Sequence, residues 1–196
     1  MQVILSPHGG LRTPDPGRSA SRRFRGTFRP YIEGLVRGRM ELVNRFAQVR
    51  RDLLETVSSF PEDKAEEAVC GQWDIKCVLA HIAGWDTYFT MIVRRLKIGK
   101  DVPYWGDNPH WGENMEKRNE ALVKEREGRT WNEVRDKFVK ASEKFLEEYS
   151  NLKGELWSQR FWEQRNPTPA WVVKHNAEHY EEHMEEIEKK LKEWEG

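Results

Sequence analysis

Residues 73–85 read WDIKCVLAHIAGW, and this stretch decides the fold. Asp74 is a favoured residue for a helix N-cap and Gly99 is a stop signal, so a helix is predicted from about Asp74 to Ile98. Apolar side chains recur along it at steps of three and four, which is the helical period. They form one stripe that consists of Val78, His81, Trp85, Tyr88, Phe89, Ile92 and Leu96. A histidine therefore lies in the stripe that faces the core.

Three further long helices and one short helix are predicted along the chain. Thr130 opens a capping box, and Thr168 is followed by Pro169, a residue preferred at the first helical position. The expected ranges are Met40–Ser59, a short helix Asn114–Glu127 between the second and third long helices, Trp131–Leu152, and Thr168 to near the C-terminus. No alternating run is long enough to make a sheet. The pattern predicts an all-α four-helix bundle.

The composition divides the chain near Met40. The 196 residues carry 33 basic and 33 acidic side chains, and 37% of the residues are hydrophobic, as expected for one globular domain. Residues 1–39 hold eight Arg, no Lys and two acidic residues, so they carry a net charge of +6 and residues 40–196 carry −6. We expect 1–39 to be a disordered basic arm or a mis-assigned N-terminal extension, and 40–196 to be the bundle domain.

Export signals and membrane spans are not visible in the sequence. No stretch approaches the roughly 18 consecutive apolar residues that a spanning helix needs. Arg22 and Arg23 are not followed by the apolar segment of a twin-arginine signal. The two cysteines, Cys70 and Cys77, are too few for a disulfide scaffold. We therefore expect a cytoplasmic protein that is not associated with a membrane.

The histidines are the residues most informative about function. His175, His179 and His183 are spaced by four, and at 100° per residue His179 and His183 point inward while His175 lies on the flank. Two histidines at this spacing can hold one divalent metal, and His81 faces the same core from another helix. Three imidazoles would leave coordination positions open for water or substrate, as in catalytic sites. The alternative is a set of polar histidines without a metal.

Residues 73–85 and the HxxxH sequence at 179–183 resemble two motifs of the DinB/YfiT-like four-helix-bundle proteins, in the second helix and near the C-terminus. The resemblance extends over about residues 40–194 in the order and spacing of helices. It implies a divalent metal, commonly zinc or nickel, at one end of the bundle. By motif, the implied ligands are His81, His179 and His183. Characterised members of the family include transferases and isomerases that depend on bacillithiol or mycothiol.

Two classes of function follow as hypotheses. The first is a metal-dependent enzyme, either a hydrolase or a small-thiol-dependent transferase, acting on a small molecule that includes or accompanies a low-molecular-weight thiol. Tyr88, on the face of His81, and Glu186, near the inward face of the last helix, are the candidates for a catalytic or ligand-supporting role. The second is a non-catalytic interaction protein with a structural or adventitious metal. We expect a homodimer under either hypothesis, and we do not expect nucleic acid as a partner.

Overall fold

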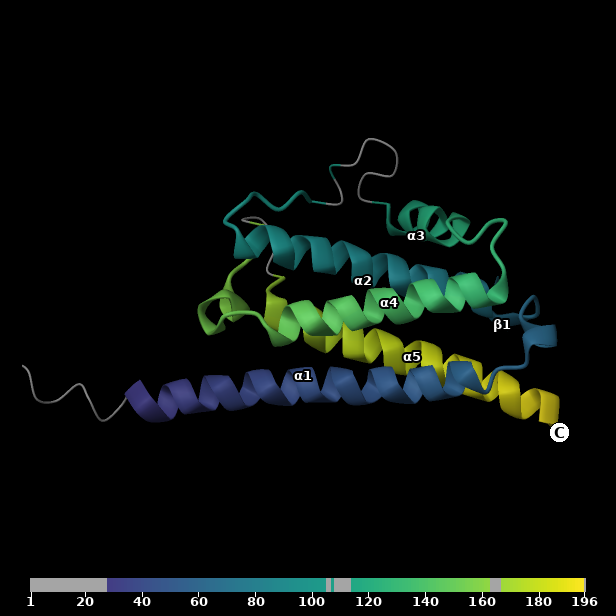
Figure 1. Cartoon of the computed structure of the whole chain (residues 1–196), viewed down its shortest axis with the longest axis horizontal. Coiled ribbons are helices and arrows are strands. Elements are labelled where there is room, and N and C mark those ends of the chain that lie inside the picture. Colours follow the sequence, from purple (N-terminus) through teal and green to yellow (C-terminus); the bar gives the residue numbers. More distant parts are fainter. Residues whose placement is uncertain (1–27, 105–106, 108–113, 163–166, 196) are drawn as a thin grey trace, which may run out of the picture. The chain divides into compact units, whose positions relative to one another are not determined.

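Five α-helices make up most of the computed structural model, which describes residues 28–104, 107, 114–162 and 167–195, with side chains from residue 36 onward. The helices are α1 (Phe28–Ser58), α2 (Ile75–Lys97), α3 (Met115–Lys124), α4 (Trp131–Ser150) and α5 (Pro169–Glu195) (Figure 1). The chain divides into two units, residues 1–35 and 36–196, and the second unit contains the bundle. The predicted all-α class is confirmed. No helix in the described ranges is long and apolar enough to cross a membrane.

The predicted helix starts are the observed ones for the four helices after α1. The Asp74 carboxylate accepts a hydrogen bond from the Cys77 backbone N–H at 2.7 Å. Thr130 and Glu133 form both bonds of a capping box at the start of α4. Asn114 and Thr168 cap α3 and α5 through their side-chain oxygens. Each cap satisfies a backbone donor that the first helical turn leaves unpaired.

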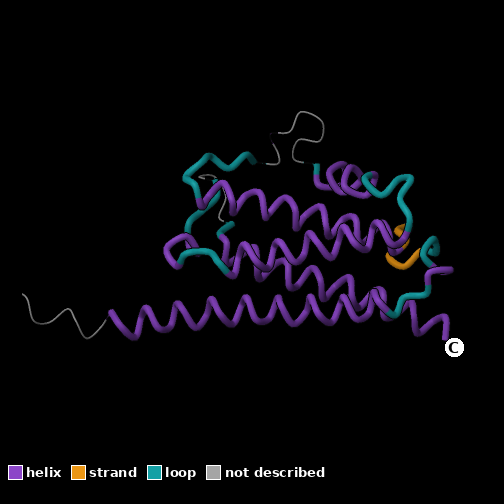
Figure 2. The backbone as a smooth tube through the Cα atoms, viewed as in Figure 1, coloured by secondary structure: helices purple, strands orange, loops and turns teal. Residues whose placement is uncertain are grey.

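Apolar stripes on α1, α2, α4 and α5 meet in one core. The short helix α3 packs against α2, beside which it runs in Figure 2. Phe46 on α1 joins two of the other helices, because its ring centroid lies 4.7 Å from Phe145 on α4 and 5.1 Å from Tyr180 on α5. The contact between α2 and α3 is close at Gly84. A Cβ atom at that position would lie 2.6 Å from a methyl carbon of Leu122. The absent side chain therefore permits the approach of α3.

The first helix begins earlier than the sequence pattern predicts. It starts at Phe28, twelve residues before Met40, and passes through Gly34 and Gly38. Pro30 falls within its first turn, where the missing N–H would have no helical acceptor in any case. Part of the segment expected to be a disordered arm is thus helical, and residues 1–27 lie outside the described residues.

A small hairpin precedes α2 and was not anticipated. Its strands, β1 (Ala68–Cys70) and β2 (Trp73–Asp74), pair antiparallel with Cys70 opposite Trp73. Gly71 has φ +57° in the connecting turn, a left-handed conformation that favours glycine. Strands of three and two residues are too short to produce an alternating pattern, which explains why sequence periodicity missed them.

A buried polar network lies in the middle of the bundle. The Asp86 side chain on α2 is fully buried and accepts hydrogen bonds from Asn176 Nδ2 at 2.8 Å and from the Tyr180 hydroxyl, both on α5. From α1, Arg50 donates to the Ser142 hydroxyl on α4 at 2.9 Å. Burial raises the pKa of Asp86 to about 7, although the hydrogen bond from Tyr180 and the positive charge of Arg50 act in the opposite direction.

The Asp86 carboxyl predicts a specific dependence of stability on pH. Its pKa is raised in the folded chain, so its stabilising contribution is present below about pH 4 and is lost as pH rises through about 7. We expect Asp86→Asn to remove this pH-dependent loss of stability, because an amide does not titrate. The free energy of unfolding of the wild type minus that of the variant should therefore fall by a few kcal/mol between pH 4 and 8. Denaturant unfolding of both proteins in chelator, at half-unit pH steps, measures this difference.

The matched control is Asp136→Asn, because Asp136 is an exposed acid on α4. Its curve should run parallel to that of the wild type over the whole range. Parallel curves for Asp86→Asn and the wild type would contradict the assignment of a raised pKa to this carboxyl.

Candidate metal centre

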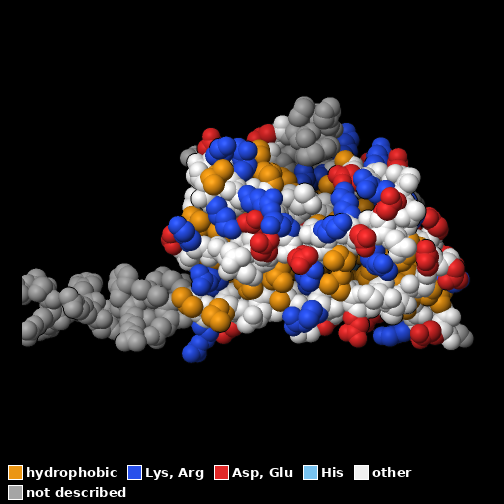
Figure 3. Space-filling view, viewed as in Figure 1, with side chains coloured by type: hydrophobic (Ala, Val, Ile, Leu, Met, Phe, Trp, Pro, Cys, Tyr) orange, Lys and Arg blue, Asp and Glu red, His pale blue; other side chains and the backbone are white. Residues whose placement is uncertain are grey.

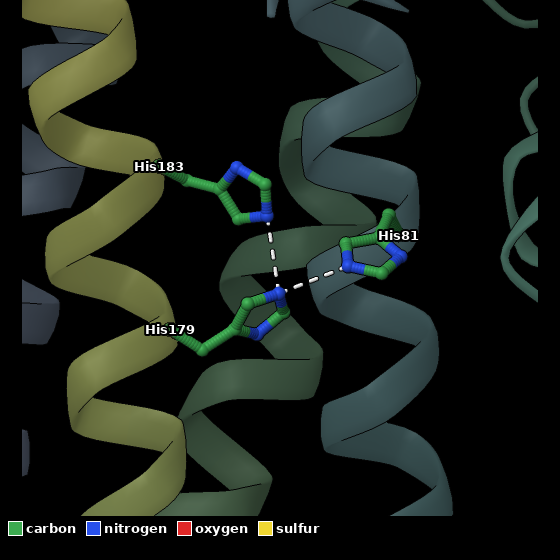
Figure 4. A group of neighbouring side chains, drawn as sticks. All are labelled: His81, His179 and His183. Atoms are coloured by element: carbon green, nitrogen blue, oxygen red, sulfur yellow. Dashed lines mark hydrogen bonds between the residues drawn. The ribbon is translucent and has the colours of Figure 1, made fainter. Parts of the chain in front are cut away.

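Three imidazoles converge at the interface of α2 and α5 (Figure 4). His81 comes from α2, and His179 and His183 come from successive turns of α5. The Nε2 atom of His179 lies 2.9 Å from Nε2 of His81 and 3.0 Å from Nε2 of His183. His81 and His183 are buried and His179 is half-buried. The structure thus brings together the three histidines singled out in the sequence, and it identifies them as a group that could hold a metal ion.

The surrounding elements fix the orientation of the rings. Trp73 on β2 packs against His81 with ring centroids 5.0 Å apart. Glu186, one turn after His183 on α5, places Oε2 2.8 Å from His183 Nδ1. A carboxylate on the far nitrogen of a ligating histidine is the usual arrangement that holds such a ring in place and directs its Nε2 lone pair. His81 has no equivalent support, since its Nδ1 is buried without a hydrogen-bond partner among the described residues.

Hydrogen bonds among the three neutral rings cannot satisfy them all. When His183 donates from Nδ1 to Glu186, its Nε2 carries a bare lone pair. A proton on Nε2 of His179 can then be donated to Nε2 of His183 or to Nε2 of His81, but not to both. The other pair of Nε2 atoms has either no proton or two protons between its atoms, so it forms no normal hydrogen bond. A divalent cation among the three Nε2 atoms would accept one lone pair from each ring. The donor set therefore fits a metal ion.

The electrostatics of the site keep two of the rings unprotonated. Burial, followed by the nearby charge of His183, lowers the pKa of His81 to about 3. Burial and the neighbouring histidines lower the pKa of His179 to about 2. Metal ligation requires the neutral form of histidine, which both residues hold at any pH near neutrality. In tetrahedral zinc sites ligand nitrogens are about 3.3 Å apart, so the observed separations need to widen by only a few tenths of an ångström.

Cys70 approaches the triad from the hairpin. Its sulfur, a ring nitrogen of His183 and the Glu186 carboxylate lie within 4.8 Å of one another. Burial and the hydrogen bond to Glu186 raise the pKa of Cys70 to about 12. In the metal-free chain the Cys70 side chain is therefore a neutral thiol near neutral pH. It contacts Glu186 as a neutral thiol and so belongs to the support of His183.

A cavity of about 520 Å³ opens beside His81 and His179. Its walls come from α2, α3, α5 and the segments at Tyr104, Trp162 and Pro167. Tyr88 does not line this cavity, and its hydroxyl donates to the Pro103 carbonyl at 3.3 Å. Asn119 and Asn176 are two polar residues of the lining that were not predicted from the sequence, because neither belongs to a recognisable motif.

Comparison with known proteins identifies a sequence family and solved structures that this chain resembles. The sequence model described as the DinB superfamily matches residues 45–187. A crystal structure of an uncharacterised protein from Escherichia coli UTI89 superposes with a TM-score of 0.69 at 10% identity, and covers 79% of this chain and 93% of that one. The colibactin self-resistance protein ClbS, crystallised in complex with double-stranded DNA, gives 0.65 at 12% identity over 77% and 93%. No curated protein matches the chain.

The DNA in the ClbS structure does not fit the expectation that nucleic acid is no partner of this chain. At 12% identity the likeness concerns the fold alone, so DNA becomes a partner to be tested.

The position of Glu186 predicts a role in metal affinity. We expect Glu186→Ala to weaken zinc binding by about tenfold or more, because His183 loses the acceptor that fixes its ring. Competition with a chromophoric zinc chelator measures the change. Glu185→Ala is the control, since Glu185 is exposed on the neighbouring position of α5. Equal zinc affinities for the two variants would show that Glu186 does not support the site.

Proposed function

This chain belongs to the DinB superfamily, and we propose that it is an enzyme in which His81, His179 and His183 hold one divalent ion, zinc or nickel. The observation that carries the proposal is the convergence of three Nε2 atoms that hydrogen bonds among neutral rings cannot satisfy. Three imidazole ligands, two of which line the cavity, leave coordination positions for a further ligand, as in catalytic rather than structural sites.

The chemistry would be that of a hydrolase or a small-thiol-dependent transferase. A divalent ion bound there would lower the pKa of a water or thiol that it ligates, which provides the anion near neutral pH. Glu186 holds the His183 ring in the orientation needed for ligation. His81 and His179 belong both to the triad and to the cavity lining, so a small molecule in the cavity lies beside the ligand atoms. The cavity volume is in the range of small-molecule sites.

Metal content tests this proposal directly. We expect about one zinc or nickel ion per chain by elemental analysis of the purified full-length protein, and its loss in a His179→Ala/His183→Ala double variant. His175→Ala serves as the control, because His175 lies one turn before His179 but outside the triad, and this variant should keep the metal. Metal that stays in the double variant would contradict the assignment of the ligands.

A non-catalytic interaction protein, acting as a homodimer, is the alternative. Its triad would hold a structural ion or none. Wild-type protein that stays metal-free after equilibration with zinc and nickel would favour this alternative over the enzyme. The reason is that the described residues bring together no other group of three histidines that could hold the ion of the proposed enzyme.

Double-stranded DNA is a second candidate ligand, supported by the ClbS complex. The face drawn in Figure 3 has acidic and basic side chains interspersed, whereas residues 1–39 carry the excess of arginine. Phosphate contacts from arginine would make binding depend strongly on salt. Because residues 1–39 carry a net charge of +6 and residues 40–196 carry −6, we attribute the contact to the arginines of the N-terminal segment.

Fluorescence anisotropy with a labelled duplex tests this attribution. We expect the full-length chain to bind at about 50 mM salt, and the affinity to fall by about tenfold or more at about 200 mM. Replacement of Arg22, Arg23 and Arg25 by Glu should abolish binding, while the same number of Lys→Glu changes on α5, at Lys189, Lys190 and Lys192, should not. Absence of binding at low salt would exclude this second function.

A further inference from the structure

The cavity beside the triad is walled by aromatic rings on three sides. On the α2 side, Trp85 and Phe89 are stacked, with centroids 5.6 Å apart and an interplanar angle of 27°. On the α5 side, Trp171 and His175 are stacked at 4.6 Å and 20°. Trp85 and Phe89 are largely buried, whereas Trp171 is 47% exposed, so these rings line the cavity with apolar surface that an aromatic ligand can contact.

The third wall joins two loop segments. Tyr104 and Trp162 meet edge to face with centroids 5.0 Å apart. The indole N–H of Trp162 donates to the Val102 carbonyl at 3.1 Å, and that of Trp85 donates to Asn119 Oδ1 at 3.2 Å. These bonds fix the rings, so a ligand binds between walls that are already ordered and loses less entropy than in a flexible site.

Charged groups are missing from the lining in the ranges that the structure describes. Its polar members are Asn119, Asn176, Tyr104 and the histidines. A charged group on the body of a ligand, away from the histidine triad, would lose hydration without meeting a counter-charge among the described lining residues, which is unfavourable. The walls therefore favour a ligand body without net charge.

We infer that the cavity takes an uncharged, planar aromatic molecule that directs a single donor atom toward the histidine triad. The directed donor atom rests on the proposed metal function, whereas the aromatic body rests on the walls alone. The substrate class is thus an aromatic compound with one thiol, hydroxyl or ring nitrogen at its edge. Such a molecule satisfies both parts of the site, since its rings meet the indoles and its donor atom lies beside His81 and His179.

Calorimetry on the zinc-loaded full-length chain tests the inference with four probes. We expect 4-phenylimidazole to bind about tenfold or more tightly than imidazole, because the phenyl ring is transferred from water to the aromatic walls. The analogues bearing a carboxylate or a trimethylammonium group on the phenyl ring should bind more weakly than 4-phenylimidazole. A charged analogue that binds more tightly would overturn the uncharged class, and equal affinities of 4-phenylimidazole and imidazole would overturn the aromatic one.

Tryptophan variants locate the binding. Trp171→Ala should abolish most of the phenyl advantage, which is the gain in affinity of 4-phenylimidazole over imidazole. Because Trp171 is 47% exposed, its removal leaves the core intact. Trp162→Ala provides a second test from the opposite wall. Trp194→Ala is the control, because Trp194 packs on Phe60 and is not part of the cavity lining. An unchanged phenyl advantage in both cavity variants would overturn the inference.

Indole separates this inference from the proposed function, because it has the aromatic body without a nitrogen lone pair for ligation. We expect it to bind the chelator-treated full-length chain, measured by ligand-observed NMR, and to lose binding in Trp171→Ala. Indole binding in a chain that takes up no zinc would support the aromatic cavity and remove the metal function. A zinc-loaded chain that binds neither indole nor 4-phenylimidazole would overturn the inference and leave the metal site standing.

Discussion

A carboxylate without access to water must find its hydrogen bonds inside the protein, and Asp86 finds them on α5. Its two partners, Asn176 and Tyr180, lie on either side of His179 in the sequence, and Asp86 itself follows His81 by five residues on α2. The pairing of Asp86 therefore sets the axial position of α2 against α5, and with it the separation of His81 from His179. A shift of one helix by a single turn would break both the polar network and the triad. Arg50 and Ser142 extend the same polar region to α1 and α4.

Most of the fold was predictable from the sequence because its signals are local. Asp74, Asn114, Thr130 and Thr168 are caps, and each acts within three residues of its own position. The start of α1 was not predictable, since Gly34 and Gly38 lower helix propensity and apolar periodicity is absent there. The angular positions of His81, His179 and His183 were enough to propose that they face one another. The cavity could not be derived, because its walls come from segments far apart in sequence, and its shape depends on tertiary packing.

The short hairpin contributes more to the site than its length suggests. Cys70 and Trp73 are paired across it, so one small element carries a thiol to Glu186 and an indole to His81. These two side chains flank the triad from the end of the bundle. The helices supply the three imidazoles, and the hairpin restricts the motion of two of them. A metal site built on rigid elements with such supporting contacts holds its ligand geometry before an ion arrives.

Gly84 is a position at which a substitution would alter the wall of the cavity without altering the histidines. The close approach of α3 to α2 depends on the missing side chain, and α3 carries Met115 and Asn119 into the cavity wall. A methyl group at residue 84 would meet the Leu122 side chain, which would have to shift, so the packing of α3 against α2 would change. Such a change would act on the cavity wall that α3 provides and not on the histidines, which lie on α2 and α5. During divergence of related chains, a single small substitution at this position would be a route to a differently shaped cavity without any change to the three histidines.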